Sequence, residues 1–136
     1  ALGRFEQIVQ KYPDEKEAWY GLGEAMFHGP GGIPARLKAL DPFEKAIELD
    51  PAFTLAYYHV VDLYIMDRRF EEGIERVRSF IAQDPDNPDW YLAWVRAVIG
   101  KGDAQEIDAA VEAMPAPVQR KPDWNSREAP LTYSAE

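Results

Sequence analysis

Apolar residues recur at helical spacing along most of the chain, in segments separated by proline, glycine and aspartate. In residues 1–12, the apolar side chains at 5, 8, 9 and 12 share one face of a helix, which Pro13 ends. Six more helices are predicted. They are one from Asp14 to about Phe27, one regular helix at Phe43–Leu49, two joined by a tight turn within Phe53–Pro85, one that starts after Pro88 and runs through Ile99, and one from Ala104 to Met114. The pattern therefore predicts an all-α chain.

The longest connection, His28–Pro42, interrupts this regularity. Four residues of glycine and proline at 29–32 occupy the place of a turn, and Pro34 is predicted to open a short helix over Ala35–Leu40. Asp41 is expected to cap the next helix, with Pro42 at its first position. No Gly-Lys-Ser/Thr sequence follows the glycines, so a phosphate-binding P-loop is not supported. We expect an enlarged surface connection here rather than a site.

Two further helix starts have the residue spacing of a capping box. The helix pairs also repeat along the chain. Asp14 precedes Glu17 by three residues, and Asp103 precedes Glu106 by three. Pro51 and Pro85 each follow an aspartate, and they lie 34 residues apart. A fixed period of this length is typical of stacked two-helix repeats.

Within these repeats the residues at fixed offsets resemble the tetratricopeptide repeat family. Trp19, Leu22 and Gly23 fit the start of its W-x2-L-G-x2-Y signature, with methionine at 26 in place of the aromatic residue. Phe43, Ala46 and Pro51 fall at the offsets of its second helix, and the next repeat keeps tyrosines at 57 and 64. The resemblance implies a right-handed α-α superhelix, or solenoid, of about seven helices, followed by an irregular C-terminal tail.

The resemblance also predicts a domain organisation. Residues 1–115 are expected to form the repeat domain, divided into a partial repeat at 1–13 and repeats at 14–51, 52–85 and 86–115. Residues 1–13 match a second helix whose first helix is absent, so we expect Phe5, Ile8 and Val9 to form an exposed apolar face that can self-associate or meet another repeat. Residues 116–136 contain prolines without helical periodicity. This tail carries Trp124, Leu131 and Tyr133, which either anchor it on the last helix pair, the interpretation we favour, or bind something else.

Composition and net charge exclude some classes of binding partner. The chain has 136 residues, of which 46% are apolar and 29% charged, as expected of one folded domain. A net charge of −9 disfavours nucleic acid and anionic membrane surfaces as ligands, although excess acid also serves solubility alone. No cysteine is present, which excludes disulfides and thiolate zinc sites. The sequence has no run of 18 apolar residues, so it predicts no membrane-spanning helix.

Catalytic and metal-binding motifs are not evident. The serines at 79, 126 and 134 lack the context of a catalytic triad, and His28 and His59 lack a metal-ligand spacing such as H-E-x-x-H. Glu71 and Glu72 are consecutive on a helix, so their side chains do not face each other. We therefore expect no enzymatic activity, no cofactor and no metal.

The family resemblance instead implies a binding groove lined by the first helices of successive repeats. The groove positions lie one, two and five residues after the tryptophan position, and one turn beyond. They select a set of aromatic, acidic, apolar and basic side chains: Tyr20, Glu24, His28, Tyr58, His59, Asp62, Met66, Leu92 and Arg96, with Gly21, Ala93 and Ile65 beside them. Members of the family that hold a chaperone's C-terminal carboxylate use lysine and asparagine there, and this chain has neither.

Three hypotheses follow. The first is a non-catalytic scaffold that binds a protein or peptide carrying basic and apolar residues, since Glu24, Asp62, Tyr20 and Tyr58 suit such a partner. These residues could equally pack against the chain itself and bind nothing. The second is an accessory or assembly module of a larger bacterial signalling or multi-subunit protein. The third is an enzyme with an unrecognised site, which would need a deep polar pocket where an acid and a histidine converge.

Overall fold

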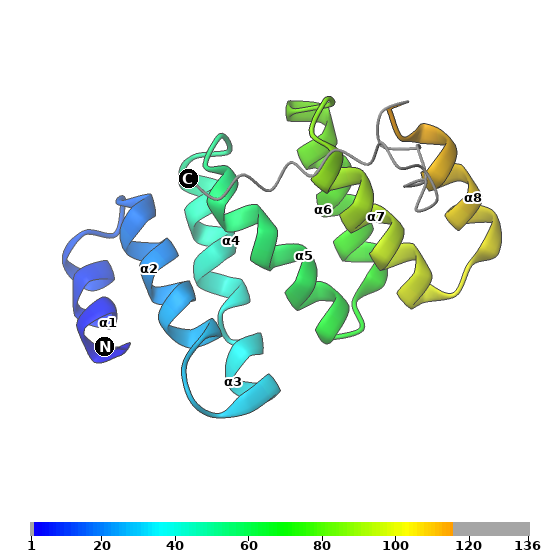
Figure 1. Cartoon of the computed structure of the whole chain (residues 1–136). Coiled ribbons are helices and arrows are strands. Elements are labelled where there is room, and N and C mark those ends of the chain that lie inside the picture. Colours follow the sequence, from blue (N-terminus) through cyan, green and yellow to red (C-terminus); the bar gives the residue numbers. More distant parts are fainter. Residues whose placement is uncertain (1, 116–136) are drawn as a thin grey trace, which may run out of the picture.

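The computed structural model describes residues 2–115, and every regular element in that range is helical. Figure 1 shows the chain as a row of helix pairs with the N-terminus at one end. In order, the elements are α1 (Leu2–Lys11), α2 (Lys16–Phe27), α3 (Gly32–Leu37), α4 (Leu40–Leu49), the 3-10 helix η1 (Thr54–Ala56), α5 (Tyr57–Met66), α6 (Phe70–Gln83), α7 (Pro88–Lys101) and α8 (Ala104–Ala113). Seven of them have ten or more residues, and the all-α prediction is confirmed.

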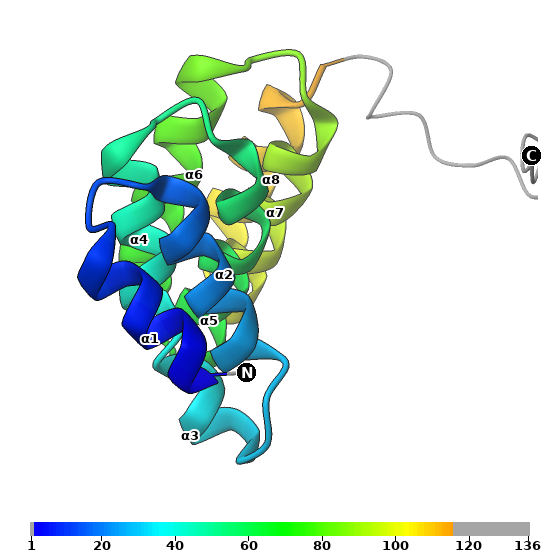
Figure 2. The same ribbon diagram turned by 90° about the vertical axis from the view of Figure 1, so that its left-hand side faces the viewer.

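The long helices form two layers. Figure 2 shows α2, α5 and α7, the first helices of successive pairs, on one side, and α1, α4 and α6 on the other. Within the pairs, α2 packs on α4, α5 on α6 and α7 on α8, while α4 on α5 and α6 on α7 join one pair to the next. This stacking is a helical solenoid, in which each repeat contacts its neighbours. Within residues 2–115, no helix combines the length and apolar character needed to cross a bilayer.

Close packing of α2 against α4 depends on Gly23. A Cβ atom added there would lie 2.5 Å from Cε1 and 2.6 Å from Cδ1 of Phe43, which is nearer than carbon atoms can approach. Phe43 is fully buried, so its ring fills the space that the missing side chain leaves. Glycine at position 23 therefore lets the ring of Phe43 on α4 pack directly against the backbone of α2.

One hydrogen bond recurs at the start of each first helix. The indole Nε1 of Trp19 donates to the carbonyl oxygen of Pro13 at 2.7 Å, and the hydroxyl of Tyr91 donates to that of Pro85 at 2.8 Å. Tyr57 donates in the same way to the carbonyl of the proline six residues before it. The aromatic residue thus ties each first helix to the turn that precedes it, which explains why aromatic side chain and proline keep a fixed separation.

A continuous core runs through the middle pairs, from Phe27 to Trp90. The rings of Tyr57 and Phe80 stack with centroids 3.6 Å apart, and Trp90 packs on both. Because these rings come from α5, α6 and α7, they hold two successive helix pairs together. Smaller clusters around Val9 and around Ile74 extend the core toward the two ends.

The start of α2 differs from the prediction, whereas the start of α8 agrees with it. Glu15 is the N-cap of α2 and makes no capping bond, so the box predicted at Asp14 is wrong. Instead the side chain of Lys16 pairs with Asp50 on the neighbouring turn. At α8, Oδ1 of Asp103 accepts a hydrogen bond from the backbone N–H of Glu106 at 3.1 Å, which is the first of the two bonds of a capping box, while the carboxylate of Glu106 pairs with Lys101.

The long connection also differs in detail. Its short helix α3 begins at Gly32 rather than Ala35, and both Gly31 and Gly32 have positive φ angles of 114° and 65°. Such angles are accessible to glycine and let the chain reverse before Pro34 is reached. The next helix begins at Leu40, with Ala39 as its N-cap, so Asp41 lies inside the helix instead of capping it. Pro42 is tolerated because the first-turn N–H groups need no helical partner.

The apolar face of α1 is divided between packing and exposure. Val9 is buried and Phe5 packs beside it against α2, so these two do not belong to an exposed face as predicted. Ile8 does, with 39% of its surface exposed, and Leu2 and Tyr12 are also open to solvent. The predicted contacts of Trp124, Leu131 and Tyr133 lie outside the described residues.

Candidate binding surface on the first helices

The nine predicted groove residues lie on three neighbouring helices of one layer. We call this set the first-helix surface. α2 carries Tyr20 and Glu24, and His28 caps its C-terminus. The remaining residues lie on α5 and α7: Tyr58, His59, Asp62 and Met66 on the former, and Leu92 and Arg96 on the latter.

Between α5 and α7, polar side chains of this surface pair with one another. Asp62 forms an ion pair with Arg96, which lies 34 residues later and occupies the same place in the next repeat. The hydroxyl of Tyr58 lies 3.3 Å from Oδ2 of Asp89, to which it donates. Both contacts connect one repeat to the next, so the charge of Asp62 is already balanced within the chain.

Beside these contacts lies a pocket of about 260 Å³. Two of its walls are large apolar side chains open to solvent, Tyr58 at 45% and Leu92 at 49% exposed. The residues that line it come from α5 and from the start and middle of α7: Tyr57, Tyr58, Val61, Asp89, Trp90, Leu92, Ala93 and Arg96. An apolar pocket with a few polar groups at its edge is the usual form of a site for a side chain or small ligand.

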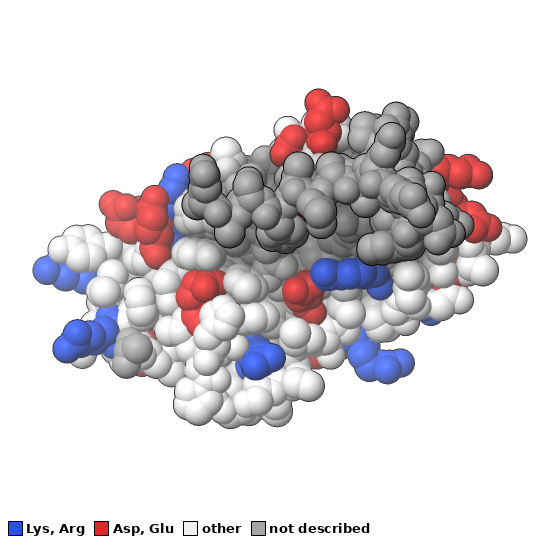
Figure 3. Space-filling view, in the orientation of Figure 1, with Lys and Arg blue, Asp and Glu red and all other residues white. Residues whose placement is uncertain are grey.

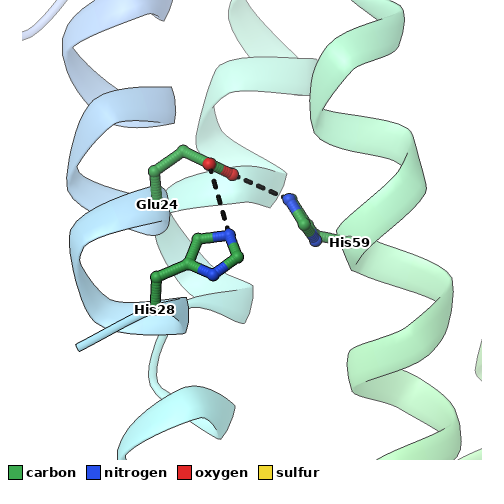
Figure 4. Close-up of side chains that lie close together, drawn as sticks. All are labelled: Glu24, His28 and His59. Carbon is green, nitrogen blue, oxygen red and sulfur yellow. Dashed lines mark ion pairs between the residues drawn. The ribbon is translucent and has the colours of Figure 1, made fainter. Parts of the chain in front are cut away.

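Between α2 and α5, one carboxylate faces two histidines. Figure 4 shows Glu24 reaching from α2 with one oxygen toward each imidazole. Oε1 of Glu24 lies 2.8 Å from Nε2 of His59, and Oε2 lies 3.5 Å from Nε2 of His28. The three ligand atoms all lie within 4.8 Å of one another, so they could hold a metal ion. An acid and two histidines thus converge, but the side chain of His28 is 62% exposed, so the cluster is not at the bottom of a deep pocket.

Aromatic rings fix the position of His59. Its ring stacks on Phe43 with centroids 5.1 Å apart and lies 4.3 Å from the ring of Phe27. Burial lowers the pKa of the His59 imidazole, and the nearby carboxylate of Glu24 opposes this effect only in part. His59 is therefore predominantly neutral near pH 7.

Two of the predicted groove residues have other environments. The ring of Tyr20 packs against Phe43 and edge-on against Phe53, so Tyr20 is part of the wall between repeats. Its burial, together with the nearby Glu24, raises the pKa of the Tyr20 hydroxyl. Met66 ends α5 and is 36% exposed, but it does not line the pocket between α5 and α7.

Charged side chains of both signs occur on the face of the described residues that Figure 3 draws. Figure 3 shows acidic and basic side chains interspersed on the visible face. Several acids there and elsewhere are paired with a neighbouring helix: Glu44 of α4, for example, contacts both Arg76 and Tyr64. Such an arrangement lacks the clustered cations by which proteins bind a phosphate backbone.

Four residues that line the pocket were not among the predicted groove residues: Tyr57, Val61, Asp89 and Trp90. Trp90 is fully buried, and its ring contacts that of Tyr58 at 5.0 Å. The dense aromatic stripe at the start of α7 was the available signal, but it does not show which of two consecutive aromatic residues faces the core. The recurring bond to proline assigns that repeat position to Tyr91 and leaves Trp90 to form the floor between α5 and α7.

Comparison with known proteins gives local relatives. No family model matches the chain. It is 41% identical over 54 residues to Superkiller protein 3 of Saccharomyces cerevisiae, a match that covers 40% of this chain and 4% of that protein. It is 26% identical over 99 residues to Hsp70-Hsp90 organizing protein 3 of Arabidopsis thaliana, which covers 73% of this chain and 17% of the relative. The chain thus spans a small part of each relative's length.

Solved structures share the fold. A MamA fragment from Desulfovibrio magneticus RS-1 that runs from residue 41 to its end superimposes with a TM-score of 0.66 at 16% identity. A MamA RS-1 double mutant gives a TM-score of 0.66 at 17% identity, and in both cases 82% of this chain and 61% of the other are covered. At this level of identity the likeness establishes the helical architecture and nothing more. The 34-residue period, the signature residues, the local relatives and this shared architecture agree with one another, and they support the resemblance of the chain to the tetratricopeptide repeat family.

Proposed function

We propose that this chain is a non-catalytic scaffold whose first-helix surface binds a segment of a partner protein. Proteins of this family generally mediate protein–protein interactions. The observation that carries the proposal here is the pocket of about 260 Å³ between α5 and α7, whose exposed walls are Tyr58 and Leu92. Exposed aromatic and aliphatic side chains around a pocket are typical anchors of a protein interface.

The charges around the pocket select the partner segment. Asp89 lies on its edge and Asp62 pairs with Arg96 beside it. A lysine or arginine next to an apolar anchor suits this arrangement, because a partner cation can approach Asp89 while the anchor enters between Tyr58 and Leu92. The predicted contributions of Glu24 and Tyr20 are weaker than those around α7, because Glu24 is engaged by two histidines and Tyr20 packs in the wall.

Peptide arrays provide the test. Peptides with leucine or phenylalanine beside lysine or arginine are compared with otherwise identical peptides that carry glutamate in place of the cation. Leu92→Ala should weaken binding of the selected peptides about tenfold, the effect of losing one apolar anchor of roughly 1–2 kcal/mol. Ile99→Ala is the matched control, because Ile99 is also exposed on α7, at 57%, but does not line the pocket.

The result that would contradict the proposal is equally defined. If Leu92→Ala left peptide binding unchanged, as the control Ile99→Ala should, the pocket would not be the binding site. If peptides with glutamate bound as well as those with lysine, Asp89 and Asp62 would have no part in selection. Tyrosine and tryptophan fluorescence during titration gives an independent readout, since Trp90 forms the pocket floor.

A second candidate is self-association through α1. Its outer face exposes Leu2, Ile8 and Tyr12 at 40%, 39% and 48%. We propose a second copy of the chain as the partner of α1, because Ile8 and Tyr12 are exposed and lie four residues apart, on one face. Ile8→Glu should abolish concentration-dependent association in analytical ultracentrifugation, and a monomeric wild-type chain would end this candidate.

A further inference from the structure

We propose that Glu24, His28 and His59 form a binding site for a divalent transition-metal ion, zinc in the first place, which joins α2 to α5. The two histidines are 31 residues apart in sequence and lie on different repeats. Only the folded chain brings them to one carboxylate, each facing a different oxygen (Figure 4). This site goes beyond the proposed protein-binding function and lies at a different junction from the pocket between α5 and α7.

The donor set fits the chemistry of zinc. In many zinc sites the protein supplies two imidazole nitrogens and one carboxylate oxygen, and a water molecule takes the fourth position. Ligand atoms 2.0–2.1 Å from a tetrahedral ion are about 3.3 Å from one another. Here one donor atom from each of the three residues lies within 4.8 Å of the other two, and the Nε2 atoms of His59 and His28 lie 2.8 Å and 3.5 Å from the two different oxygens of Glu24.

The remaining adjustment falls on the residue that can move. His28 is the C-cap of α2 and its side chain is 62% exposed, so rotation about its side-chain bonds can bring Nε2 closer to Nε2 of His59. His59 need not move, because the rings of Phe27 and Phe43 hold its imidazole plane. One mobile ligand and one fixed ligand on opposite sides of a carboxylate allow an ion to enter from solvent.

A second observation concerns Glu24 itself. Oε1 is closed to solvent, and Nε2 of His59 lies 2.8 Å away from it. A carboxylate oxygen that water does not reach needs a partner, which is either an imidazole N–H or a cation bound between the two groups.

The competing explanation is an ion pair. A protonated histidine beside Glu24 would account for the proximity without any metal. A protonated imidazole cannot bind a metal ion, so the two explanations exclude each other at His59. The two explanations differ in whether added zinc is bound with defined stoichiometry.

The experiment uses the full 136-residue chain without a histidine tag, freed of metal with a chelator and titrated with zinc chloride at neutral pH by isothermal titration calorimetry. We expect one ion per chain. We also expect His59→Gln and His28→Asn each to weaken binding at least tenfold, since loss even of a group that only supports a ligand costs about 10–100-fold. Asp62→Asn is the matched control: it removes an acid from the same surface, paired with Arg96 and not with the histidines, and should bind zinc as the wild type does.

Cobalt supplies the second measurement. Substitution of Co²⁺ should give the visible absorption bands of a four-coordinate ion, and His28→Asn should abolish them while leaving the far-ultraviolet circular dichroism unchanged, because His28 is exposed. Absence of binding by the wild-type chain would overturn the proposal. Binding that survives both histidine substitutions would overturn it as well, since the ion would then be held elsewhere.

Discussion

The contact between Gly23 and Phe43 gives a prediction whose sign depends on the background. In the wild-type chain, Gly23→Ala places a methyl group 2.5–2.9 Å from three carbon atoms of the Phe43 ring. The ring cannot move freely, since it is fully buried and in contact with Tyr20 and His59. Such overpacking costs about 1–3 kcal/mol, which exceeds the roughly 1 kcal/mol that alanine gains over glycine in a helix. Gly23→Ala should therefore lower the free energy of unfolding by about 1 kcal/mol.

In a Phe43→Leu background the same substitution should stabilise. Leucine removes the ring atoms that the new methyl group would meet, so the gain in helix propensity, about 0.5–1 kcal/mol, is no longer opposed. The difference between the two backgrounds is a coupling energy of about 2 kcal/mol, within the range measured for residues in contact. Phe43→Leu alone should be destabilising, because it leaves a cavity between α2 and α4.

Urea unfolding followed by circular dichroism and fluorescence measures all four chains of this cycle, and an unchanged dependence on urea shows that the same surface unfolds. Gly3→Ala is the control: a Cβ atom added at Gly3 in α1 meets nothing within 4 Å, so only propensity changes. If Gly23→Ala stabilised both backgrounds by the amount that Gly3→Ala does, the close approach of α2 and α4 argued above would be wrong.

Three further predictions test other parts of the fold. Tyr57→Phe removes the hydroxyl bond to the preceding turn and should lower the free energy of unfolding by about 1 kcal/mol in urea, whereas Tyr12→Phe, at a residue 48% exposed, should not. Asp103→Ala removes the cap of α8 and should cost about 1 kcal/mol, with hydrogen exchange rising first in α8; a uniform rise would contradict this. Burial holds the pKa of His59 in the folded chain below its ordinary value of 6.5, so the unfolded chain binds more protons as the pH falls below that value. The contribution of neutral His59 to the free energy of unfolding should be fully present above pH 6.5 and should decline below it. His59→Gln should therefore flatten the dependence of the thermal-unfolding midpoint on pH below 6.5, and an unaltered dependence would refute the burial of a neutral His59 as its cause.

The repeat architecture was accessible from sequence because its signals are local. The 34-residue period, the prolines and the spacing of apolar residues are all short-range features, and each is explained by a contact such as that of Gly23 with Phe43. The long connection was less accessible. Glycine at 31 and 32 permits many backbone conformations, so sequence could not show that the chain would reverse there and begin α3 three residues early.

The residues of the first-helix surface could be placed on helices, but their partners could not. Which side chain of one repeat meets which of the next depends on the rotation between helix pairs, a quantity that a repeat length does not contain. The sequence left open whether Asp62 would face a basic partner or a group of the chain itself, and in the structure it pairs with Arg96. His28 and His59 showed no metal-ligand spacing because their common partner, Glu24, lies one turn before the first and a repeat before the second.

These internal pairs determine what a partner must supply. Asp62 and Arg96 have side chains 36% and 55% exposed, and a surface ion pair contributes only about 0–1 kcal/mol, so a partner's lysine can replace Arg96 at small cost. Glu24 differs, because its Oε1 is closed to solvent and its carboxylate faces two imidazoles. A peptide cation would have to displace both, whereas a metal ion would join all three groups. Under the two proposals made above, the α5–α7 junction would recognise a partner, and a metal ion at the α2–α5 junction would fix the angle between the repeats.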